Sequence, residues 1–450
     1  MPTDPITRRS FVGDLARTGL AAAVAPTIVP RHVLGRGQRA PSDRLNIACV
    51  GVGGMGRNDV SGVSGENVYA LCDVDWKAAT DAFASFPKAK RYRDFREMLD
   101  VDGAHIDAVT VSTPDHAHAV IAMAALKLGK HVYCQKPLAH MMWEVQELER
   151  EAARRPTQAT QMGNQGHAGD GTRQIREWVE AGAIGPVREV HYWTDRPIWP
   201  QALDRPTEMH HVPPTLAWDL WLGPATDRPY HPEYAPFRWR GWWDFGTGAL
   251  GDIACHAMDA AFWTLGLRYP TRIDVESTSL FAETAPKSSR IVYHFPARGD
   301  RAPLTVVWRD GGLIPPRPPE VARDAPWPPF ADGGQLWIGD AGKLVAGMYG
   351  QSPRLLDARA DAELRAHPPA ERYPRVKSVY AEWIDASKTG TQPGSNFAGH
   401  AGPLTEMVLL GNLALRMGHT LEVHPETGTV TSAEVPHEYL RPQYRKGWGL

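Results

Sequence analysis

The sequence predicts an α/β protein whose N-terminal half folds as a doubly wound parallel sheet. Short apolar runs alternate with helical segments between residues 45 and 162, which is typical of parallel strands joined by crossover helices. The first run leads directly into the glycine-rich turn Gly51-Val52-Gly53-Gly54-Met55-Gly56. Polar residues follow the ends of several later runs, where sheets of this kind bind their ligands.

The glycine-rich turn follows the first expected strand, at residues 45–50. Gly51 permits a tight turn, Gly53 lets the backbone approach a pyrophosphate, and Gly56 lets the next helix pack against the strand. The phosphates would lie at the N-terminus of that helix, where free N–H groups and the helix dipole favour an anion. A tight strand–helix turn without a ligand is the alternative interpretation of this motif.

Asp73 ends the second apolar run, at residues 68–72. The spacing from the glycines is about that of the acidic residue that hydrogen-bonds an adenosine ribose in dinucleotide-binding folds. The same carboxylate would repel the 2′-phosphate of NADP. The sequence therefore predicts NAD as the cofactor, with NADP less favoured.

The remaining elements of this half follow in alternation. We expect helices at residues 93–100, 116–128 and 142–154, and strands at residues 106–112, 131–134 and 159–162. Thr113-Pro114-Asp115 forms a turn after one of these strands, and Lys136 follows another. Gly51, Asp73, Thr113 and Lys136 thus fall at the carboxyl ends of parallel strands, on one edge of the sheet.

The chain resembles the Gfo/Idh/MocA oxidoreductase family over roughly residues 45–418. The motifs that carry the resemblance are the glycine turn with Asp73, Thr113-Pro114-Asp115-His116-Ala117-His118, Gln135-Lys136-Pro137-Leu138 and Gly251-Asp252-Ile253-Ala254-Cys255-His256. The resemblance implies a Rossmann domain and a C-terminal α/β domain with a large, mostly antiparallel sheet, which commonly forms an oligomer interface. We expect a signal and linker at 1–40, the nucleotide-binding domain at 41–165 and the substrate-binding domain at 166–450. A sugar or polyol would bind in the cleft between domains.

The resemblance also assigns the catalytic residues. Lys136 matches the family's catalytic lysine, and Asp252 and His256 match its Asp-x-x-x-His pair, in which the histidine is the general acid/base and the aspartate orients. Residues four apart share one face of a helix. Oxidising an alcohol removes a hydride and a proton, and only the hydride goes to the cofactor, so such groups are needed. A lysine in a surface turn, a helix-start aspartate and a buried structural histidine are the alternatives.

The cofactor-binding set combines the glycine turn with the later strand ends. Its members are Gly51, Gly53, Gly54, Met55, Gly56, Asp73, Thr113, Pro114, His118, Gln135 and Lys136. Gln135 stands where the family usually has Glu. An amide keeps a hydrogen-bonding group at this position but removes the negative charge beside Lys136.

The C-terminal half shows strand patterns and one long helix. We expect strands at residues 273–281, 289–295, 304–308, 335–338 and 343–346, and an amphipathic helix at 403–417. A Pro-rich stretch at 314–330 predicts a long surface loop. Aromatic residues interleaved with Arg and Asp suit a sugar; they are Trp193, Trp199, Trp218, Trp221, Trp239, Trp242 and Trp243. Which of them contact a ligand stays open.

The N-terminus contains a possible export signal. Thr7-Arg8-Arg9-Ser10-Phe11-Val12 resembles a twin-arginine motif, and an apolar stretch too short to span a membrane follows at residues 19–29. This pattern predicts a periplasmic protein. Cleavage after Ala25 stays open because Pro26 follows it, and an ordinary helix with a chance arginine pair is the alternative.

Composition excludes several other classes of function. A formal net charge of −2 indicates neither nucleic acid nor an anionic membrane as a partner, and no later segment has a transmembrane pattern. Cys49, Cys72 and Cys134 fall on or beside expected strands and Cys255 on an expected helix, which is not a disulfide framework. The histidine pairs at 116/118 and 210/211 have no third ligand at a suitable spacing, so no metal is expected.

Three functions are compatible with these residues. The first is an NAD(P)-dependent oxidoreductase acting on a sugar or cyclitol hydroxyl, with a tightly bound, internally recycled cofactor. The second is an NAD-dependent glycosidase or lyase that transiently oxidises a sugar carbon. The third is a non-catalytic sugar-binding homologue. A homo-oligomer is expected in each case.

Overall fold

The glycine-rich turn follows β1, which belongs to a six-stranded parallel sheet with the order β3-β2-β1-β4-β5-β6. This order confirms the predicted doubly wound fold. The strands are β1 (Asn46–Val50), β2 (Asn67–Cys72), β3 (Lys90–Tyr92), β4 (Ala108–Val111), β5 (His131–Cys134) and β6 (Thr160–Met162). The helices between them are α3 (Met55–Gly62), α4 (Thr80–Ser85), α5 (Phe95–Asp102), α6 (Asp115–Lys127) and α7 (Met142–Ala153). The computed structural model describes residues 43–450, so the predicted export signal lies outside the described residues.

The central strands of this sheet are apolar and buried because helices cover both of its faces. Every residue of β4 is buried, as are the last four of β1. Three of the cysteines are in β1, β2 and β5, and Cys255 is in α10 (Gly248–Ala257). All four are buried free thiols, in agreement with the sequence analysis.

An eight-stranded sheet forms the second part of the molecule, with the order β13-β12-β11-β7-β10-β9-β8-β14. Strands β7 and β10 pair in parallel and the other neighbours are antiparallel, which confirms the mostly antiparallel sheet. The strands are β7 (Val187–Thr194), β8 (Arg272–Ser277), β9 (Ser289–Phe295), β10 (Leu304–Arg309), β11 (Gly333–Gly339), β12 (Lys343–Gly347), β13 (Arg354–Leu355) and β14 (Leu421–Glu422).

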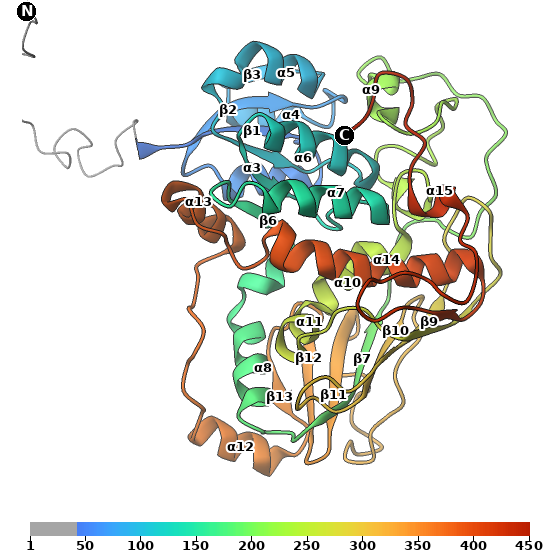
Figure 1. Cartoon of the computed structure of the whole chain (residues 1–450). Helices are drawn as coiled ribbons and strands as arrows, with labels where there is room; N and C mark the ends of the chain where they lie inside the picture. The colour runs from blue at the N-terminus through green and yellow to red at the C-terminus, as the bar shows by residue number, and fades with distance from the viewer. Residues whose placement is uncertain (1–42) are drawn as a thin grey trace, which may run out of the picture. The chain divides into compact units, whose positions relative to one another are not determined.

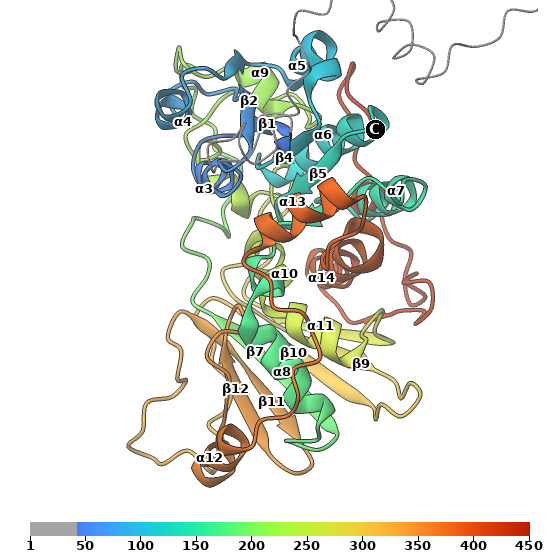
Figure 2. The ribbon, with the colours of Figure 1, turned by 90° about the vertical axis from the view of Figure 1, so that its left-hand side faces the viewer.

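Helix α14 (Gly402–Met417) lies between the two sheets in both ribbon views (Figures 1 and 2). Its first fourteen residues are all buried, so the predicted amphipathic helix has no solvent-facing side over that length. The reason is tertiary: the helix packs on α7 from the first domain and on α10 and β8 from the second. The prediction of a helix here is confirmed, but the prediction that one side of it is polar and faces water is wrong for these fourteen residues.

Six further helices complete the described α-helices. They are α8 (Asp170–Glu180), α9 (Trp218–Leu222), α11 (Asp259–Leu265), α12 (Ala358–Ala366), α13 (Val379–Thr389) and α15 (His437–Leu440). Helix α13 returns to the first sheet, where the Trp383 indole packs on Tyr133 and donates a hydrogen bond to the carbonyl oxygen of Ala159. The core of the first domain therefore includes a segment from the C-terminal part of the chain.

Residues 310–332, which include the Pro-rich stretch, contain no helix or strand, as predicted for a loop. The loop also covers apolar surface of the second sheet. Trp327 and Phe330 pack against Trp193 of β7, whose indole nitrogen donates to the Phe330 carbonyl oxygen at 2.9 Å. The loop thus shields one face of β7, β11 and β12 from water.

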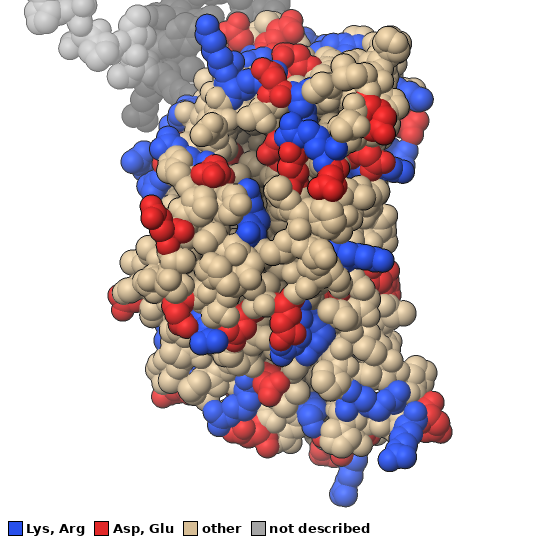
Figure 3. All heavy atoms as spheres, turned by 90° about the vertical axis from the view of Figure 1, so that its right-hand side faces the viewer, with Lys and Arg blue, Asp and Glu red and all other residues tan. Residues whose placement is uncertain are grey.

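Charged side chains of both signs are interspersed on the face shown in Figure 3. No large patch of one sign is visible there, in keeping with the near-zero net charge. None of the helices within residues 43–450 combines the length and apolar character that a bilayer span requires.

The substitution Gly56→Ala tests the packing of the glycine turn. A Cβ at position 56 would lie 1.8 Å from the carbonyl oxygen of Gly51, so the turn has to open. We expect a loss of about 1–3 kcal/mol in the free energy of unfolding, with weakened dinucleotide binding. Denaturant unfolding and binding titration measure both. Gly65→Ala is the control, because a Cβ there meets nothing within 4 Å; equal effects of the two substitutions would contradict the prediction.

Candidate functional site

A cavity of about 630 Å³ opens at the carboxyl ends of the parallel strands. Its wall brings together side chains and turns that the sequence analysis placed at those ends, namely Gly51, Gly53, Gly54, Met55, Asp73, Thr113, Pro114, Gln135 and Lys136. Asp252 from α10 completes the wall from the other side. Residues from both sheets' domains therefore face one cavity.

The glycine turn forms a cradle suited to a phosphate group. Gly51 has a φ of 76°, and a Cβ there would meet the backbone of Ser112 at 2.7 Å. Gly54, just before the N-terminus of α3, has nothing within 4 Å of a Cβ position and lines the cavity. The hydroxyl oxygen of Thr113 is buried on the same wall without a partner among the described residues. These features fit a dinucleotide.

Asp73 holds the glycine turn against the end of β2. One carboxylate oxygen accepts hydrogen bonds from the backbone N–H groups of Val52 at 2.8 Å and Gly53 at 3.1 Å, and the other accepts from Asp75 at 2.9 Å. Burial raises the pKa of Asp73, while these three N–H donors act in the opposite direction. Asp73, which is predicted to contact a ribose, therefore also stabilises the glycine turn.

Lys136 and Asp252 connect the two sides of the cavity. The Lys136 ammonium donates to the Asp252 backbone oxygen at 2.7 Å and to a carboxylate oxygen at 2.9 Å. The guanidinium of Arg240 lies 3.4 Å from the same carboxylate oxygen. Burial by itself would raise the pKa of Asp252, but the two cations outweigh it and hold the pKa below its ordinary value. Asp252 is therefore ionised at neutral pH.

His256 lies one turn further along α10, as predicted for a residue four positions from Asp252. It is buried beside the ring of Tyr349, at 4.7 Å between ring centroids, and is not among the residues that line the cavity. Burial, and then the positive charge of Lys136, lower the pKa of His256 to about 3. The imidazole is therefore neutral at pH 7, and its Nδ1 has no partner among the described residues.

Gln135 is directed at a buried carboxylate rather than at the Lys136 ammonium. Its amide nitrogen donates to both carboxylate oxygens of Asp59, at 3.0 and 2.9 Å. Ser112 and Tyr380 donate to the same carboxylate at 2.6 and 2.8 Å. Burial raises the pKa of Asp59, and its hydrogen-bond donors oppose that change. The Gln135 amide is therefore one of the hydrogen-bond donors that stabilise the buried Asp59 carboxylate.

His118 does not reach the cavity wall, in contrast to its prediction as a cofactor-binding residue. Its ring nitrogens lie 2.8 Å from the Pro137 carbonyl oxygen and 2.9 Å from that of Thr113. Helix α6 begins at Asp115, and this places position 118 on a buried face between the two turns. His118 therefore holds together the segments that carry Thr113 and Lys136.

The aromatic residues that the sequence analysis associated with a sugar form only part of the wall. Of the crowded tryptophans, Trp221 and Trp239 line the cavity, whereas Trp193 and Trp242 are fully buried in the core. Arg240 stacks over the Trp239 ring at 4.4 Å. Asp115 lies within a recognised motif, but no role was assigned to it.

Trp448 also lines the cavity, although it follows the glycine turn by nearly the whole chain. Its ring packs on Phe95, and the Arg96 guanidinium lies 4.2 Å above it. Nothing in the local sequence around Trp448 indicates this position.

Two family models match this chain. Residues 45–162 match the Gfo/Idh/MocA model described as "Oxidoreductase family, NAD-binding Rossmann fold", and residues 176–300 match the model of the family's C-terminal alpha/beta domain. Together they span more than half of the chain. The chain belongs to the Gfo/Idh/MocA oxidoreductase family. The first sheet and its helices are therefore the NAD-binding Rossmann domain of a Gfo/Idh/MocA protein.

Curated relatives of this Gfo/Idh/MocA protein include two sugar or cyclitol enzymes by name. Inositol 2-dehydrogenase of Salmonella typhimurium is 30% identical over 154 residues, which cover 33% of this chain and 45% of that enzyme. Levoglucosan dehydrogenase of Pseudarthrobacter phenanthrenivorans is 24% identical over 235 residues, which cover 49% of this chain and 51% of that enzyme. The chain thus spans about half the length of the curated relatives it matches.

Solved structures share the fold over a larger part of the chain. A levoglucosan dehydrogenase in complex with NADH has a TM-score of 0.56 at 17% identity and covers 85% of this chain and 99% of its own. The WlbA dehydrogenase from Bordetella pertussis, in complex with NADH and UDP-GlcNAcA, has a TM-score of 0.56 at 16% identity, with coverage of 85% and 99%.

The substitution Gln135→Glu tests the pairing of Gln135 with Asp59. It places two carboxyl groups in contact in a buried site, so their mutual repulsion raises the pKa of the pair above that of the unfolded chain. Stability is then retained at about pH 4 and lost as the pH rises towards about pH 8. We expect a loss of about 3–5 kcal/mol at the higher pH, measured by denaturant unfolding across the range.

The double substitution Asp59→Asn with Gln135→Glu is the matched control. It restores one carboxylate and one amide with their positions exchanged, so the pH-dependent loss disappears. A single Gln135→Glu variant with the stability of the unmodified protein at high pH would show that the two side chains do not interact as described.

Proposed function

We propose that this protein is an NAD-dependent dehydrogenase that oxidises a hydroxyl group of a sugar or cyclitol. The observation that carries the proposal is the Lys136–Asp252 contact at 2.9 Å on the wall of the cavity that the glycine turn also lines. A charged pair able to bind and orient a hydroxyl thus lies beside a dinucleotide cradle. The names of the relatives, inositol 2-dehydrogenase and levoglucosan dehydrogenase, support this substrate class.

The residues on the wall suit the parts of NAD. The N–H groups of Gly54 and Met55, at the N-terminus of α3, would bind the pyrophosphate, Asp73 a ribose and the Thr113 hydroxyl a polar group near the reacting end. NAD, when bound, supplies the acceptor for the hydride. Trp221 and Trp239 offer apolar faces for a sugar ring, and Arg240 offers hydrogen-bond donors to its hydroxyl groups.

Proton transfer falls to the groups on and beside the cavity wall. The hydroxyl that loses a hydride also loses a proton, and we assign its movement to Lys136 and His256. Asp252 positions the Lys136 ammonium through two contacts. The His256 imidazole is neutral at pH 7 and its Nδ1 has no partner among the described residues, and its low pKa means that a proton it receives is readily passed on.

The substitutions Lys136→Met and His256→Ala test this assignment. Each removes a group assigned to proton transfer, so we expect turnover to fall about 10²–10⁴-fold while nucleotide binding is retained. The measurement is the loss of substrate and the formation of its oxidised product across a panel of sugars and cyclitols. Lys127→Met, at an exposed position of α6, is the control and retains full activity. A loss below about threefold for either residue would remove it from the mechanism.

We further propose that the protein is exported through its twin-arginine motif with the cofactor already bound. Twin-arginine export carries folded proteins, and the periplasm has no maintained supply of NAD. A recycled, tightly held nucleotide removes the need for that supply. The C-terminal segment supports this arrangement, because Trp448 lines the cavity and Arg445 anchors the segment to Asp219 at 2.6 Å and Asp227 at 2.7 Å.

Extensive desalting tests the retention of the nucleotide. We expect the desalted protein to release NAD, and not NADP, on denaturation, as measured by mass spectrometry, because Asp73 disfavours a 2′-phosphate. We also expect activity without added nucleotide, with one sugar oxidised and another reduced. Protein that emerges empty and works only with external NAD would contradict tight retention. Release of an aglycone without net NADH would assign the glycosidase reaction instead.

A further inference from the structure

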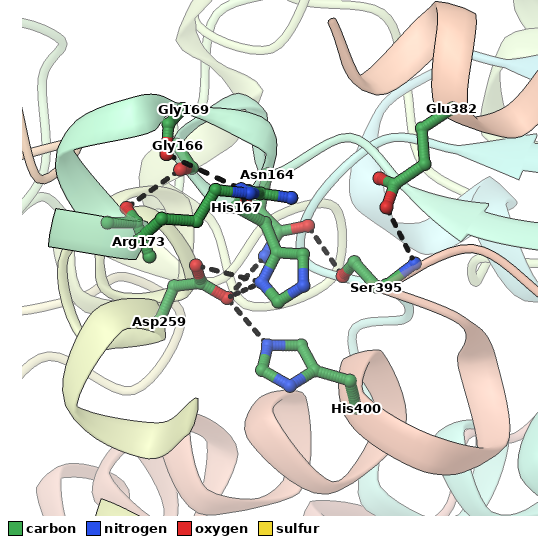
Figure 4. Close-up of polar contacts among 11 residues, drawn as sticks. Asn164, Gly166, His167, Gly169, Arg173, Asp259, Glu382, Ser395 and His400 are labelled. Carbon is green, nitrogen blue, oxygen red and sulfur yellow. Dashed lines mark hydrogen bonds and ion pairs between the residues drawn. The ribbon is translucent and has the colours of Figure 1, made fainter. Parts of the chain in front are cut away.

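Three buried side chains from separate parts of the chain meet at one point (Figure 4). They are His167 of the 3-10 helix η3 (Gln165–Ala168), Asp259 at the start of α11 and His400 of the π-helical turn η5 (Phe397–Ala401). One nitrogen or oxygen atom of each lies within 4.8 Å of the others. The two imidazole rings are 4.3 Å apart between centroids.

The contacts converge on one carboxylate oxygen. Oδ1 of Asp259 lies 2.6 Å from Nε2 of His400, 3.0 Å from Nδ1 of His167 and 2.8 Å from the amide nitrogen of Asn164. Oδ2 has a single contact of this kind, with His167 at 3.1 Å. Two imidazole nitrogens thus face the same side of one carboxylate.

The three side chains of the cluster are shielded from water. His167 and Asp259 are each 1% exposed and His400 is 5% exposed.

A second carboxylate lies next to the cluster. Oε1 of Glu382 accepts from the Gly394 N–H, and Oε2 is buried with no partner among the described residues. A Cβ on Gly394 would touch both Nε2 of His167, at 2.7 Å, and Glu382, at 3.1 Å. The cluster therefore combines two imidazole rings with two neighbouring carboxyl groups, a combination that a bound cation would balance.

We propose that His167, Asp259 and His400 bind a divalent first-row transition-metal ion, with Zn²⁺ the best match. Two imidazoles and one carboxylate are a ligand set that Zn²⁺ and Fe²⁺ accept, whereas Mg²⁺ and Ca²⁺ prefer oxygen ligands alone. The nearby polar groups provide outer support: Asn164 donates to Asp259, and Ser395 donates to the oxygen of Asn164 at 2.7 Å. The π-helical turn places His400 toward the cluster, and such turns are frequent at functional sites.

The site would join three segments that meet around the catalytic helix. His167 follows β6 of the Rossmann domain, Asp259 begins the helix directly after α10, and His400 precedes α14. Asp259 is three residues beyond His256, so a metal bound here fixes the end of α10 and acts as a structural ion. The proposal depends on this cluster and not on the reaction proposed for the cavity.

Metal analysis of the full-length protein tests the proposal. The protein is purified without an affinity tag, incubated with Zn²⁺, dialysed and measured by plasma mass spectrometry. We expect about one ion per chain in the unmodified protein and less than about a tenth of that in His400→Gln and Asp259→Asn. His191→Gln is the control, because His191 is a buried histidine paired with Glu189 and Arg309 outside the cluster, and it retains the ion.

Two measurements on the unmodified protein decide the question even where a variant fails to fold. Removal of the ion with a strong chelator lowers the Tm, and added Zn²⁺ restores it. Loading with Co²⁺ gives visible absorption bands of low-symmetry nitrogen and oxygen coordination. Absence of bound metal after Zn²⁺ loading, an unchanged Tm with chelator, or full metal content in folded His400→Gln would each overturn the proposal.

Discussion

The contact between Lys136 and Asp252 is the interaction on which the candidate site depends. Lys136 follows the last residues of β5 in the Rossmann domain, and Asp252 is on α10 of the second domain. The pair is largely shielded from water, with side chains 14% and 11% exposed. Loss of either member would leave the other charge with less compensation in a largely buried place, and Asp252 would then have Arg240 alone, at 3.4 Å. It therefore sets how the two walls of the cavity approach each other.

Other features of the fold support this junction from behind. Helix α14 fills the space between the two sheets, and α13 returns to cover the Rossmann core near Tyr133. His118 links the Thr113 and Pro137 turns through their carbonyl oxygens. Segments from separate parts of the chain thus pack around the turn that carries Lys136.

Local patterns in the sequence were sufficient for much of the fold. The predicted strands at 131–134 and 289–295 coincide with β5 and β9, because apolar runs between turn residues identify strands directly. Most of the glycine turn and Asp73 line the cavity, since they follow strands that these runs identify, and their binding of a cofactor stays a prediction. Three things required tertiary information: the complete burial of α14, the pairing of Gln135 with Asp59, and the inward position of His118. In each case the contacting residues lie far along the chain or on another element, so the local pattern of apolar residues does not predict the contact.

The His167, Asp259 and His400 cluster shows the same limit. Its members are separated by long stretches of sequence, so a search for closely spaced ligands finds only the histidine pairs at 116/118 and 210/211. Neither of those pairs belongs to the cluster that the structure brings together. The sequence contains the residue types of a metal site, but the spacing of these residues does not indicate that they meet.

The pairing of Gln135 with Asp59 also constrains how this chain can diverge. A single exchange of Gln135 for the family's usual glutamate places two carboxyl groups together, and a single exchange of Asp59 for asparagine leaves two amides facing each other. Each intermediate is less favourable than the starting pair or the exchanged pair. The two positions are therefore epistatic: the effect of either substitution depends on the residue already present at the other, and a lineage that changes one is under selection to change both.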